Sequence, residues 1–277
     1  DQACQQGYQR MRTIVTLTTD FGTRDAYVAQ LKGVLYAHGP DALEVVDLTH
    51  EIAAQGVLEA ALFVRAAWPR FPTGTIHLVV VDPGVGSARR ALALSHAQQL
   101  WLGPDNGVMS LALESAEPRA VALDPTRVGS GQVSATFHGR DLFAPAAARL
   151  AHGAALDSLG SAAQELVRLA LPALRRSRSE LQGEVLHVDR YGNLISNISR
   201  ADLRALAPGE EGRERLHARV GGSEWLPLVR CYADVESGTA AALVGSSEQL
   251  EIAVTNGHAA RQLGSAVGTP VFVRLEP

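Results

Sequence analysis

The chain has 277 residues, 46% of them hydrophobic and 19% charged, which favours one large domain or two ordinary ones and excludes global disorder. The formal net charge is −4 without a basic stripe, so the charge pattern argues against a nucleic-acid partner. Two cysteines are too few for a disulfide framework or a zinc-ligand set, and we expect a reducing, cytoplasmic setting. No apolar run reaches the ~18 residues of a transmembrane helix, so we expect no membrane partner.

The first part of the chain alternates short apolar strands with helices. Residues 1–10 lack the apolar segment of a signal peptide, and we expect them to be an upstream or non-native tail. Strands are expected at 13–18, 43–48, 75–81, 91–95 and 100–102, and helices at 25–38, 55–68 and 141–152. This alternation predicts an α/β domain with a mainly parallel sheet over residues 11–172.

The pattern changes after about residue 171. The charged stretch 175–179 predicts a linker, which we place at 173–182. Alternating strands separated by turn residues follow, at 184–188, 216–220, 241–244 and 250–256. They predict a second, compact β-domain over residues 183–277.

The first three strands each end in polar residues. Asp20 follows the first strand, Asp47 and His50 close the second, and Asp82 follows the third. In an open α/β sheet the carboxyl ends of the strands share one edge, where ligands bind. One such Asp is as often a turn or helix-cap residue, but three successive strands ending this way favour a small-molecule site.

The stretch 82–90, Asp-Pro-Gly-Val-Gly-Ser-Ala-Arg-Arg, is the sharpest local signal. Its proline and two glycines allow the backbone to approach a ligand closely. Asp82 and Arg89 can form a charge-assisted pair across this turn, although a purely structural salt bridge is an equal alternative. The stretch matches neither a dinucleotide-binding fingerprint nor a phosphate-binding loop.

Two further stretches of the first domain carry polar residues. Residues 103–107 form a tight turn, for which a structural role is the better interpretation. His138 lies beside a glycine in a predicted loop, where functional residues concentrate. Asp141 is expected to cap the following helix, and Arg140 either binds an anion or pairs with Asp141.

Two stretches of the second domain are polar as well. Asp189, Asn193 and Asn197 crowd around a turn, which by itself favours a hairpin. Ser246 and Ser247 belong to a turn of small residues whose backbone N–H groups could face a carboxylate.

Taken in order from residue 18 to residue 256, these motifs resemble the SAM hydroxide adenosyltransferase family, the hydrolytic relatives of fluorinase and chlorinase. The most specific stretches are 19–22, 47–50, 81–89, 104–107, 137–141, 189–197 and 246–256. The resemblance implies an N-terminal α/β domain, a C-terminal β-barrel-like domain and a homotrimer with active sites at the subunit interfaces. It also implies hydrolysis of S-adenosylmethionine to adenosine and methionine, with no cofactor and no metal.

The resemblance implies a role for each matching residue. Asp82, Arg89 and His138 correspond to the set that activates hydroxide. From their chemistry we expect the guanidinium to stabilise developing hydroxide, Asp82 to hold Arg89 and accept a hydrogen bond from the water, and His138 to orient the water or take its proton. The implied substrate contacts are Asp20 to the ribose diol, Asp189 to the methionine amine, Asn193 near the adenosine, Ser246 and Ser247 at the methionine carboxylate, and the backbone of Val254 and Asn256 at the adenine edge.

Departures from the halogenating relatives favour water as the nucleophile. Asp82 stands where those relatives carry a tyrosine, and Ile195 where they carry a tryptophan. His138 and Gly139 replace their Tyr-Ser-type pair, and the long insertion of fluorinase after Arg90 is absent. Three alternatives stay open: a halide-using relative, a metal-dependent phosphoesterase that uses the strand-end Asp and His residues, and a non-catalytic module that binds SAM or adenosine.

Overall fold

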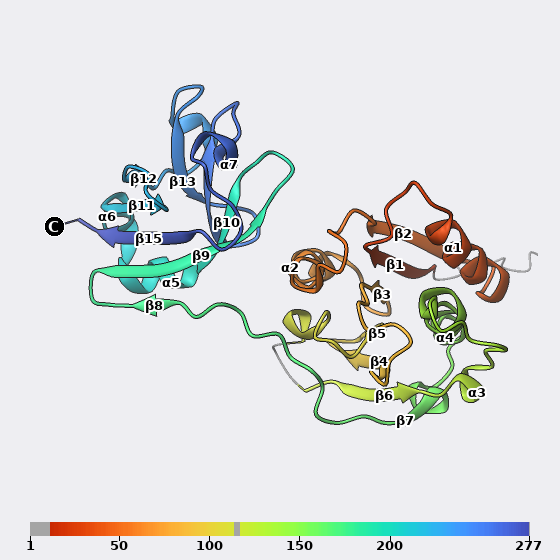
Figure 1. Ribbon diagram of the computed structural model, residues 1–277. Coiled ribbons are helices and arrows are strands. Elements are labelled where there is room, and N and C mark those ends of the chain that lie inside the picture. Colours follow the sequence, from red (N-terminus) through yellow and green to blue (C-terminus); the bar gives the residue numbers. More distant parts are fainter. Residues whose placement is uncertain (1–11, 114–116, 277) are drawn as a thin grey trace, which may run out of the picture. The chain divides into compact units, whose positions relative to one another are not determined.

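A computed structural model describes residues 12–113 and 117–276 of the chain. The chain divides into two compact units, the first ending at Leu169 and the second beginning at Ala170 (Figure 1). Within the described residues, no helix is both long enough and apolar enough to span a membrane.

The first unit is built on a sheet whose described strands are β1 (Thr13–Thr19), β2 (Leu43–Thr49), β3 (Ile76–Val80), β4 (Ala91–His96), β5 (Gln99–Pro104), β6 (Arg119–Leu123) and β7 (Gly160–Ala162). Their order is β2-β1-β3-β5-β4-β6-β7. β2, β1, β3 and β5 run parallel, whereas β4, β6 and β7 join antiparallel. The predicted mainly parallel sheet is confirmed, and the carboxyl ends of β1, β2 and β3 meet at one edge.

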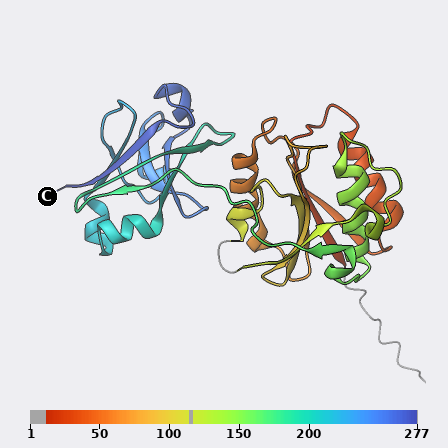
Figure 2. The ribbon, with the colours of Figure 1, turned by 60° about the horizontal axis from the view of Figure 1, so that its bottom comes forward.

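Helices cover both faces of this sheet (Figure 2). α1 (Tyr27–His38) and α4 (Ala144–Ala151) pack on one face, and α2 (Val57–Ala67) packs on the other. In β3, Leu78 and Val80 join the core under α1 and α4, whereas Val79 joins the core under α2. A strand buried on both faces explains why β3 is an uninterrupted apolar run. The shorter helical segments are η1 (Trp68–Arg70), η2 (Ser110–Ala112), α3 (Pro125–Val128), the π-helical turn η3 (Gly139–Phe143) and η4 (Leu156–Leu159).

The second unit holds the strands β8 (Arg175–Arg176), β9 (Glu180–Val188), β10 (Leu194–Ser199), β11 (Leu216–Val220), β12 (Leu226–Pro227), β13 (Ala240–Val244), β14 (Gln249–Val254) and β15 (Pro270–Leu275). Their antiparallel order is β12-β11-β15-β9-β10-β14-β13, with β8 paired to β9 inside the stretch expected as a linker. A bridge from Leu228 to Ala242 joins the two ends of this order. The sheet is therefore a nearly closed barrel, as the resemblance implies. Its helices are α5 (Arg200–Leu206), α6 (Gly209–Glu214), η5 (Tyr232–Asp234) and α7 (Ala259–Gln262).

The two faces of the barrel wall differ in chemistry. Leu194, Ile252 and Ala242 lie side by side in register and belong to the apolar core. The next set in register, Ile195, Glu251 and Leu243, lies on the opposite face of the same strands, because successive side chains alternate. A carboxylate therefore occupies the centre of that second face.

Candidate functional site

Three charged or titratable side chains meet beyond the carboxyl end of β3. Arg89 Nε donates to Asp82 Oδ1 at 3.0 Å, and Arg89 Nη2 pairs with Asp82 Oδ2. The same Nη2 lies 2.8 Å from Nδ1 of His138, which is 49 residues further along the chain. The side chains of Asp82 and Arg89 are only 5% and 11% exposed, so their bidentate pair is formed largely out of water. The structure thus brings together the three residues predicted as the hydroxide-activating set.

The loop after β3 is shaped to reach the segment that carries His138. Gly86 adopts a φ of +79°, and a Cβ atom there would lie 2.4 Å from the carbonyl oxygen of Ala135. Ser87 Oγ closes the turn by donating to the carbonyl of Gly84 at 2.7 Å. Glycine at position 86 therefore allows the loop to dock against the chain just before His138.

The contact with Arg89 fixes the protonation state of His138. A guanidinium has only donors, so Nδ1 of His138 must offer its lone pair and the neutral ring carries its proton on Nε2. Burial is the main cause that lowers the pKa of His138, and the positive charge of Arg89 lowers it further. At neutral pH His138 thus presents an Nε2–H donor. In the chain, His138 is directly followed by the π-helical turn η3, a type of turn that is common at functional sites.

The residue that follows Asp20 makes an aromatic contact with the segment before His138. Phe21, which follows Asp20, packs edge-on against Phe137, which precedes His138, with 5.6 Å between the ring centroids. Asp20 itself accepts a hydrogen bond at Oδ2 from the backbone N–H of Gln55 at 2.8 Å. The loop that follows the first strand and the segment before His138 are therefore in contact, and Asp20 immediately precedes the residue that makes this contact.

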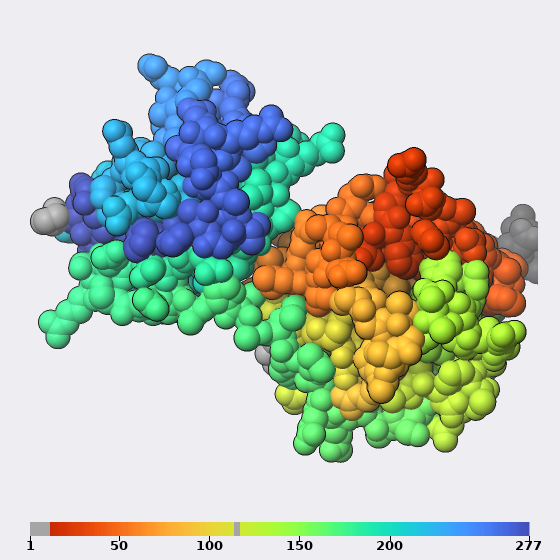
Figure 3. Space-filling model, in the orientation of Figure 1, coloured from red at the N-terminus to blue at the C-terminus, as the bar shows by residue number. Residues whose placement is uncertain are grey.

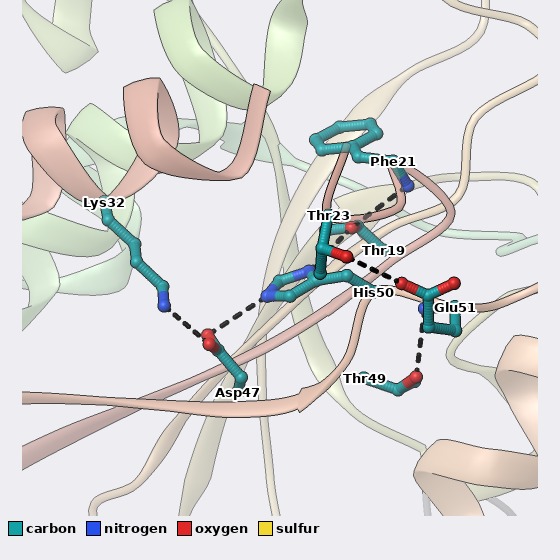
Figure 4. Close-up of polar contacts among 8 residues, drawn as sticks. All are labelled: Thr19, Phe21, Thr23, Lys32, Asp47, Thr49, His50 and Glu51. Atoms are coloured by element: carbon teal, nitrogen blue, oxygen red, sulfur yellow. Dashed lines mark hydrogen bonds and ion pairs between the residues drawn. The ribbon is translucent and has the colours of Figure 1, made fainter. Parts of the chain in front are cut away.

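The carboxyl end of β2 carries a separate polar network (Figure 4). Asp47 binds Lys32 Nζ at 2.5 Å and His50 Nε2 at 3.1 Å, and His50 Nδ1 lies 2.8 Å from Thr19 Oγ1. Burial alone would raise the pKa of Asp47, but its bonds to Lys32 and His50 outweigh burial and lower that pKa. In the described parts of the chain, no three His, Cys, Asp or Glu side chains are arranged as a metal site. Asp47 and His50 thus act as partners of other protein groups.

Two other motifs of the first unit have structural contacts. In the turn at 103–107, Asp105 pairs with Arg90, and Asn106 Nδ2 donates to the carbonyl of Val81 at 2.9 Å. Arg140 makes a bidentate pair with Asp141, which is one of the two roles expected for it. The expected capping role of Asp141 is wrong. This carboxylate accepts the N–H of Ser134, which is outside the helix, because the helix already begins as the turn η3.

In the second unit, Asp189 organises the turn between β9 and β10. Its Oδ1 accepts the backbone N–H groups of Tyr191 and Asn193, both at 2.9 Å, and its Oδ2 accepts the side-chain amide of Asn193 at 3.0 Å. Tyr191 at the tip is 74% exposed, and the hairpin protrudes from the body of this unit (Figure 3). The structure shows the predicted hairpin, and the three hydrogen bonds leave one lone pair of the Asp189 carboxylate, on Oδ2, without a donor among the described residues.

The other candidate residues of the second unit lie at the two ends of β14. Ser246 and Ser247 form an exposed turn before the strand, whereas Val254 ends it and Asn256 follows in the left-handed region with a φ of +54°. Six strand residues at ~3.3 Å each separate these ends by about 20 Å. A ligand that contacts both ends must be extended and lie along the strand.

The sequence prediction missed Glu251 and Tyr232. Glu251, in the middle of β14, is 6% exposed, and one of its carboxylate oxygens accepts a hydrogen bond from the hydroxyl of Tyr232. In sequence Glu251 stands between Leu250 and Ile252, a pattern typical of a solvent-facing position on a half-buried strand. No local signal marked it as buried.

Comparisons with known proteins cover nearly the whole chain. Residues 15–160 match the model of the SAM hydroxide adenosyltransferase N-terminal domain, and residues 183–272 match that of the C-terminal domain. The (R)-S-adenosyl-L-methionine hydrolase of Thermus thermophilus is 39% identical, and the alignment covers 94% of this chain and 99% of that protein. A fluorinase from Actinoplanes sp. is 28% identical, with 80% and 83% covered. The crystal structure of an uncharacterized conserved protein from Thermotoga maritima matches with a TM-score of 0.87 and 31% identity, over 95% of this chain and all of that one.

Proposed function

The chain belongs to the SAM hydroxide adenosyltransferase family, and we propose that it is an enzyme that hydrolyses S-adenosyl-L-methionine to adenosine and L-methionine. The observation that carries the proposal is the contact of Asp82, Arg89 and His138 at the carboxyl end of β3. It joins a buried carboxylate, a fixed cation and a neutral imidazole beside a strand edge that binds ligands in α/β folds.

The chemistry requires a nucleophile more than it requires an acid. Attack at the ribose 5′ carbon forms a C–O bond and breaks the C–S bond, whose electron pair stays on sulfur, so methionine leaves as a neutral thioether. Water donates the oxygen and releases one proton for each SAM consumed. Arg89 supplies the fixed positive charge that stabilises developing hydroxide, and such preorganised charge is worth a few kcal/mol in a largely buried site.

The protonation state of His138 determines which role it can take in the reaction. Because Nδ1 is occupied by Arg89, the free Nε2–H orients the attacking oxygen as a hydrogen-bond donor. Asp82 holds the guanidinium through two hydrogen bonds and accepts from the water. Of the two roles that the sequence leaves to His138, orientation of the water therefore fits the geometry, while proton acceptance would first require the bond to Arg89 to break.

Water is proposed over halide because of residues at the site. Asp82 and His138 fill the positions of two tyrosine-type residues in the halogenating relatives, and Ile195 replaces a tryptophan. A carboxylate held beside the nucleophile accepts a hydrogen bond from water but repels a halide ion.

The substrate contacts are proposals of the same kind. We assign Asp20 to the ribose diol and Asp189 to the methionine amine. Asn193 is placed near the adenosine, Ser246 and Ser247 at the methionine carboxylate, and the backbone of Val254 and Asn256 at the adenine edge. The 20 Å spacing of the ends of β14, at about 3.3 Å per residue, suits an extended substrate.

The remaining parts of the proposal concern assembly, location and cofactors. We propose a homotrimer with active sites at subunit interfaces, a cytoplasmic location and a reaction without cofactor or metal. Light scattering after size-exclusion chromatography tests the trimer, cell fractionation tests the location, and full activity in the presence of a chelator tests the absence of a metal requirement.

Incubation of the purified protein with SAM, followed by chromatography, tests the reaction. We expect adenosine and methionine in equal amounts, with one proton released per turnover. A halogenated adenosine that forms only with added halide would indicate a halogenase. Bound SAM that stays intact over hours would indicate a binding module, and loss of activity with chelator would favour a metallo-enzyme.

A further inference from the structure

Glu251 is a buried carboxylate whose partner among the described residues is neutral. Its side chain lies on the face of β14 opposite the barrel core, with Ile195 and Leu243 as its neighbours in register. It is only 6% exposed, and yet no Lys, Arg or His of residues 12–113 and 117–276 forms an ion pair with it. A buried charge normally has such a partner, because removal from water is costly.

The contacts of Glu251 are specific. The hydroxyl of Tyr232 donates to its Oε1, and the carbonyl of Tyr232 accepts the hydroxyl of Thr255 at 2.9 Å, which holds this segment over the sheet. The Oε2 atom accepts no hydrogen bond within the described residues and lies against Gly245, where a Cβ atom would be only 2.3 Å away. Gly245 immediately precedes Ser246, so the carboxylate borders the turn that we assign to the methionine carboxylate.

Asp189 lies on the same face of the barrel wall as Glu251. It follows Val188, which is in register with Leu194 and Ile252 on the core face, so alternation places Asp189 on the opposite face with Ile195 and Glu251. Asp189 makes no ion pair within the described residues either, and its three hydrogen bonds all come from neutral amides. Burial raises the pKa of Glu251, and the negative charge of Asp189 raises it further. The same charge contributes to the raised pKa of Tyr232, after burial and the bond to Glu251. Two carboxylates near each other, one of them buried, favour a cation between them.

We propose that Glu251 and Asp189 together form the subsite for the substrate's α-ammonium group, with Tyr232 as the residue that positions Glu251. This inference rests on the proposed function, because it takes SAM as the ligand, and it adds a binding residue to the site. The chain holds the two carboxylates in place before the ligand binds, and the ammonium group of the ligand supplies the positive charge that they lack. No bond is made or broken in this step.

The test compares two substrates in Glu251→Gln, which keeps the shape of the side chain and its acceptor for Tyr232 but removes the charge. One substrate is SAM, and the other is its analogue without the α-amino group. For SAM we expect KM to rise roughly ten- to hundredfold with little change in kcat, since a charge-assisted hydrogen bond lost in the ground and transition states weakens uniform binding. For the deamino analogue we expect KM to be the same in both proteins.

Matched controls separate this role from a structural one. Glu210→Gln changes an exposed carboxylate of α6 that pairs with Arg213, outside every residue assigned to the substrate, and it should leave both KM values unchanged. Should Glu251→Gln fold poorly, Glu251→Asp withdraws the carboxylate by one methylene and must show the same dependence on the amino group. Tyr232→Phe should raise KM for SAM by a smaller factor than Glu251→Gln.

The outcomes distinguish the subsite from the reaction. Equal effects of Glu251→Gln on SAM and the deamino analogue, or no effect on either, would overturn the subsite. If the wild-type protein does not turn over SAM, the proposed function fails. Calorimetry with methionine and with 4-methylthiobutanoate then decides the subsite on its own, because only methionine carries the ammonium group.

Discussion

The charged groups of the two units are arranged in opposite ways. In the first unit, Asp82, Arg89 and His138 satisfy one another, so a buried carboxylate has its cation before any ligand arrives. In the second unit, Asp189 and Glu251 have neutral partners only among the described residues. The first arrangement suits groups that must be preorganised for chemistry, and the second suits a place where the ligand brings the missing charge.

This contrast gives opposite expectations for removing one charge from each region. Loss of a charge from the first set should cost both stability and activity. Loss of a charge from the second should weaken substrate binding while stabilising the free protein.

The largest effect is expected for Asp82→Asn. Without the carboxylate the guanidinium of Arg89 loses its anchor, and we expect adenosine formation to slow by ~10²–10³-fold. Because one partner of a buried pair is removed, the free energy of unfolding should also fall by about 3 kcal/mol. Chromatographic rate assays and denaturant unfolding measure the two effects.

The control for Asp82→Asn is Asp157→Asn, which breaks an exposed pair with Arg119. The side chains of that pair are 62% and 65% exposed, so we expect less than about 0.5 kcal/mol and an unchanged rate. Wild-type turnover in Asp82→Asn would contradict the assignment of the first set as the catalytic one.

An intermediate effect is expected for Gly86→Ala, which tests how the first set is assembled. The new Cβ would lie 2.4 Å from the carbonyl oxygen of Ala135 and in a left-handed conformation, so the loop must move away from the His138 segment. We expect a loss of about 3 kcal/mol in unfolding free energy and a rate at least ~10-fold lower, because small displacements disrupt catalytic geometry.

Gly74→Ala is the matched control for this change. Gly74 has a φ of +81°, but no atom of the described residues outside its own chain neighbours lies within 4 Å of its Cβ position, so only the backbone cost of about 1 kcal/mol applies. If the two variants behaved alike, the close approach of the loop to Ala135 would not position His138.

The smallest effect is expected for the stability of Glu251→Gln, and it has the opposite sign. Burial, and then the charge of Asp189, raise the pKa of Glu251 in the folded protein above the value of 4.5 for the unfolded chain. As the pH rises past 4.5, Glu251 therefore loses its proton more readily in the unfolded chain, and the free energy of unfolding falls. At neutral pH we expect Glu251→Gln to be more stable than wild type by about 1 kcal/mol. Below pH 4.5 the difference should vanish.

Denaturant unfolding across this pH range, without substrate, measures the effect. Glu248→Gln should not stabilise the protein, because the bond from Arg200 lowers the pKa of Glu248 and favours its charged form. If the Glu251→Gln protein were less stable than wild type at neutral pH, the carboxylate would stabilise the folded protein, which would contradict the expectation.

Local patterns in the sequence predicted the elements that depend on local chemistry. The apolar run before Asp82 predicted the doubly buried strand β3, and the turn residues around Asp189 predicted a hairpin. The expected helix at 141–152 was correct over α4, but its start was not. The chain enters helical geometry at Gly139, where a Cβ atom would lie 3.3 Å from the ring of Phe137 and 3.4 Å from that of Phe21. Asp141 was therefore misassigned as a cap.

Sequence patterns alone were enough to predict the fold class, the polar ends of three strands and the candidates Asp82, Arg89 and His138, because each depends on periodicity or on an ordered motif. Which ring nitrogen of His138 carries the proton follows from the tertiary structure alone, because it depends on the contact of Nδ1 with Arg89, a donor 49 residues away. Only the tertiary structure buried Glu251 as well. Its strand pattern is that of a surface residue, and the segment carrying Tyr232 covers it through contacts that no local pattern encodes.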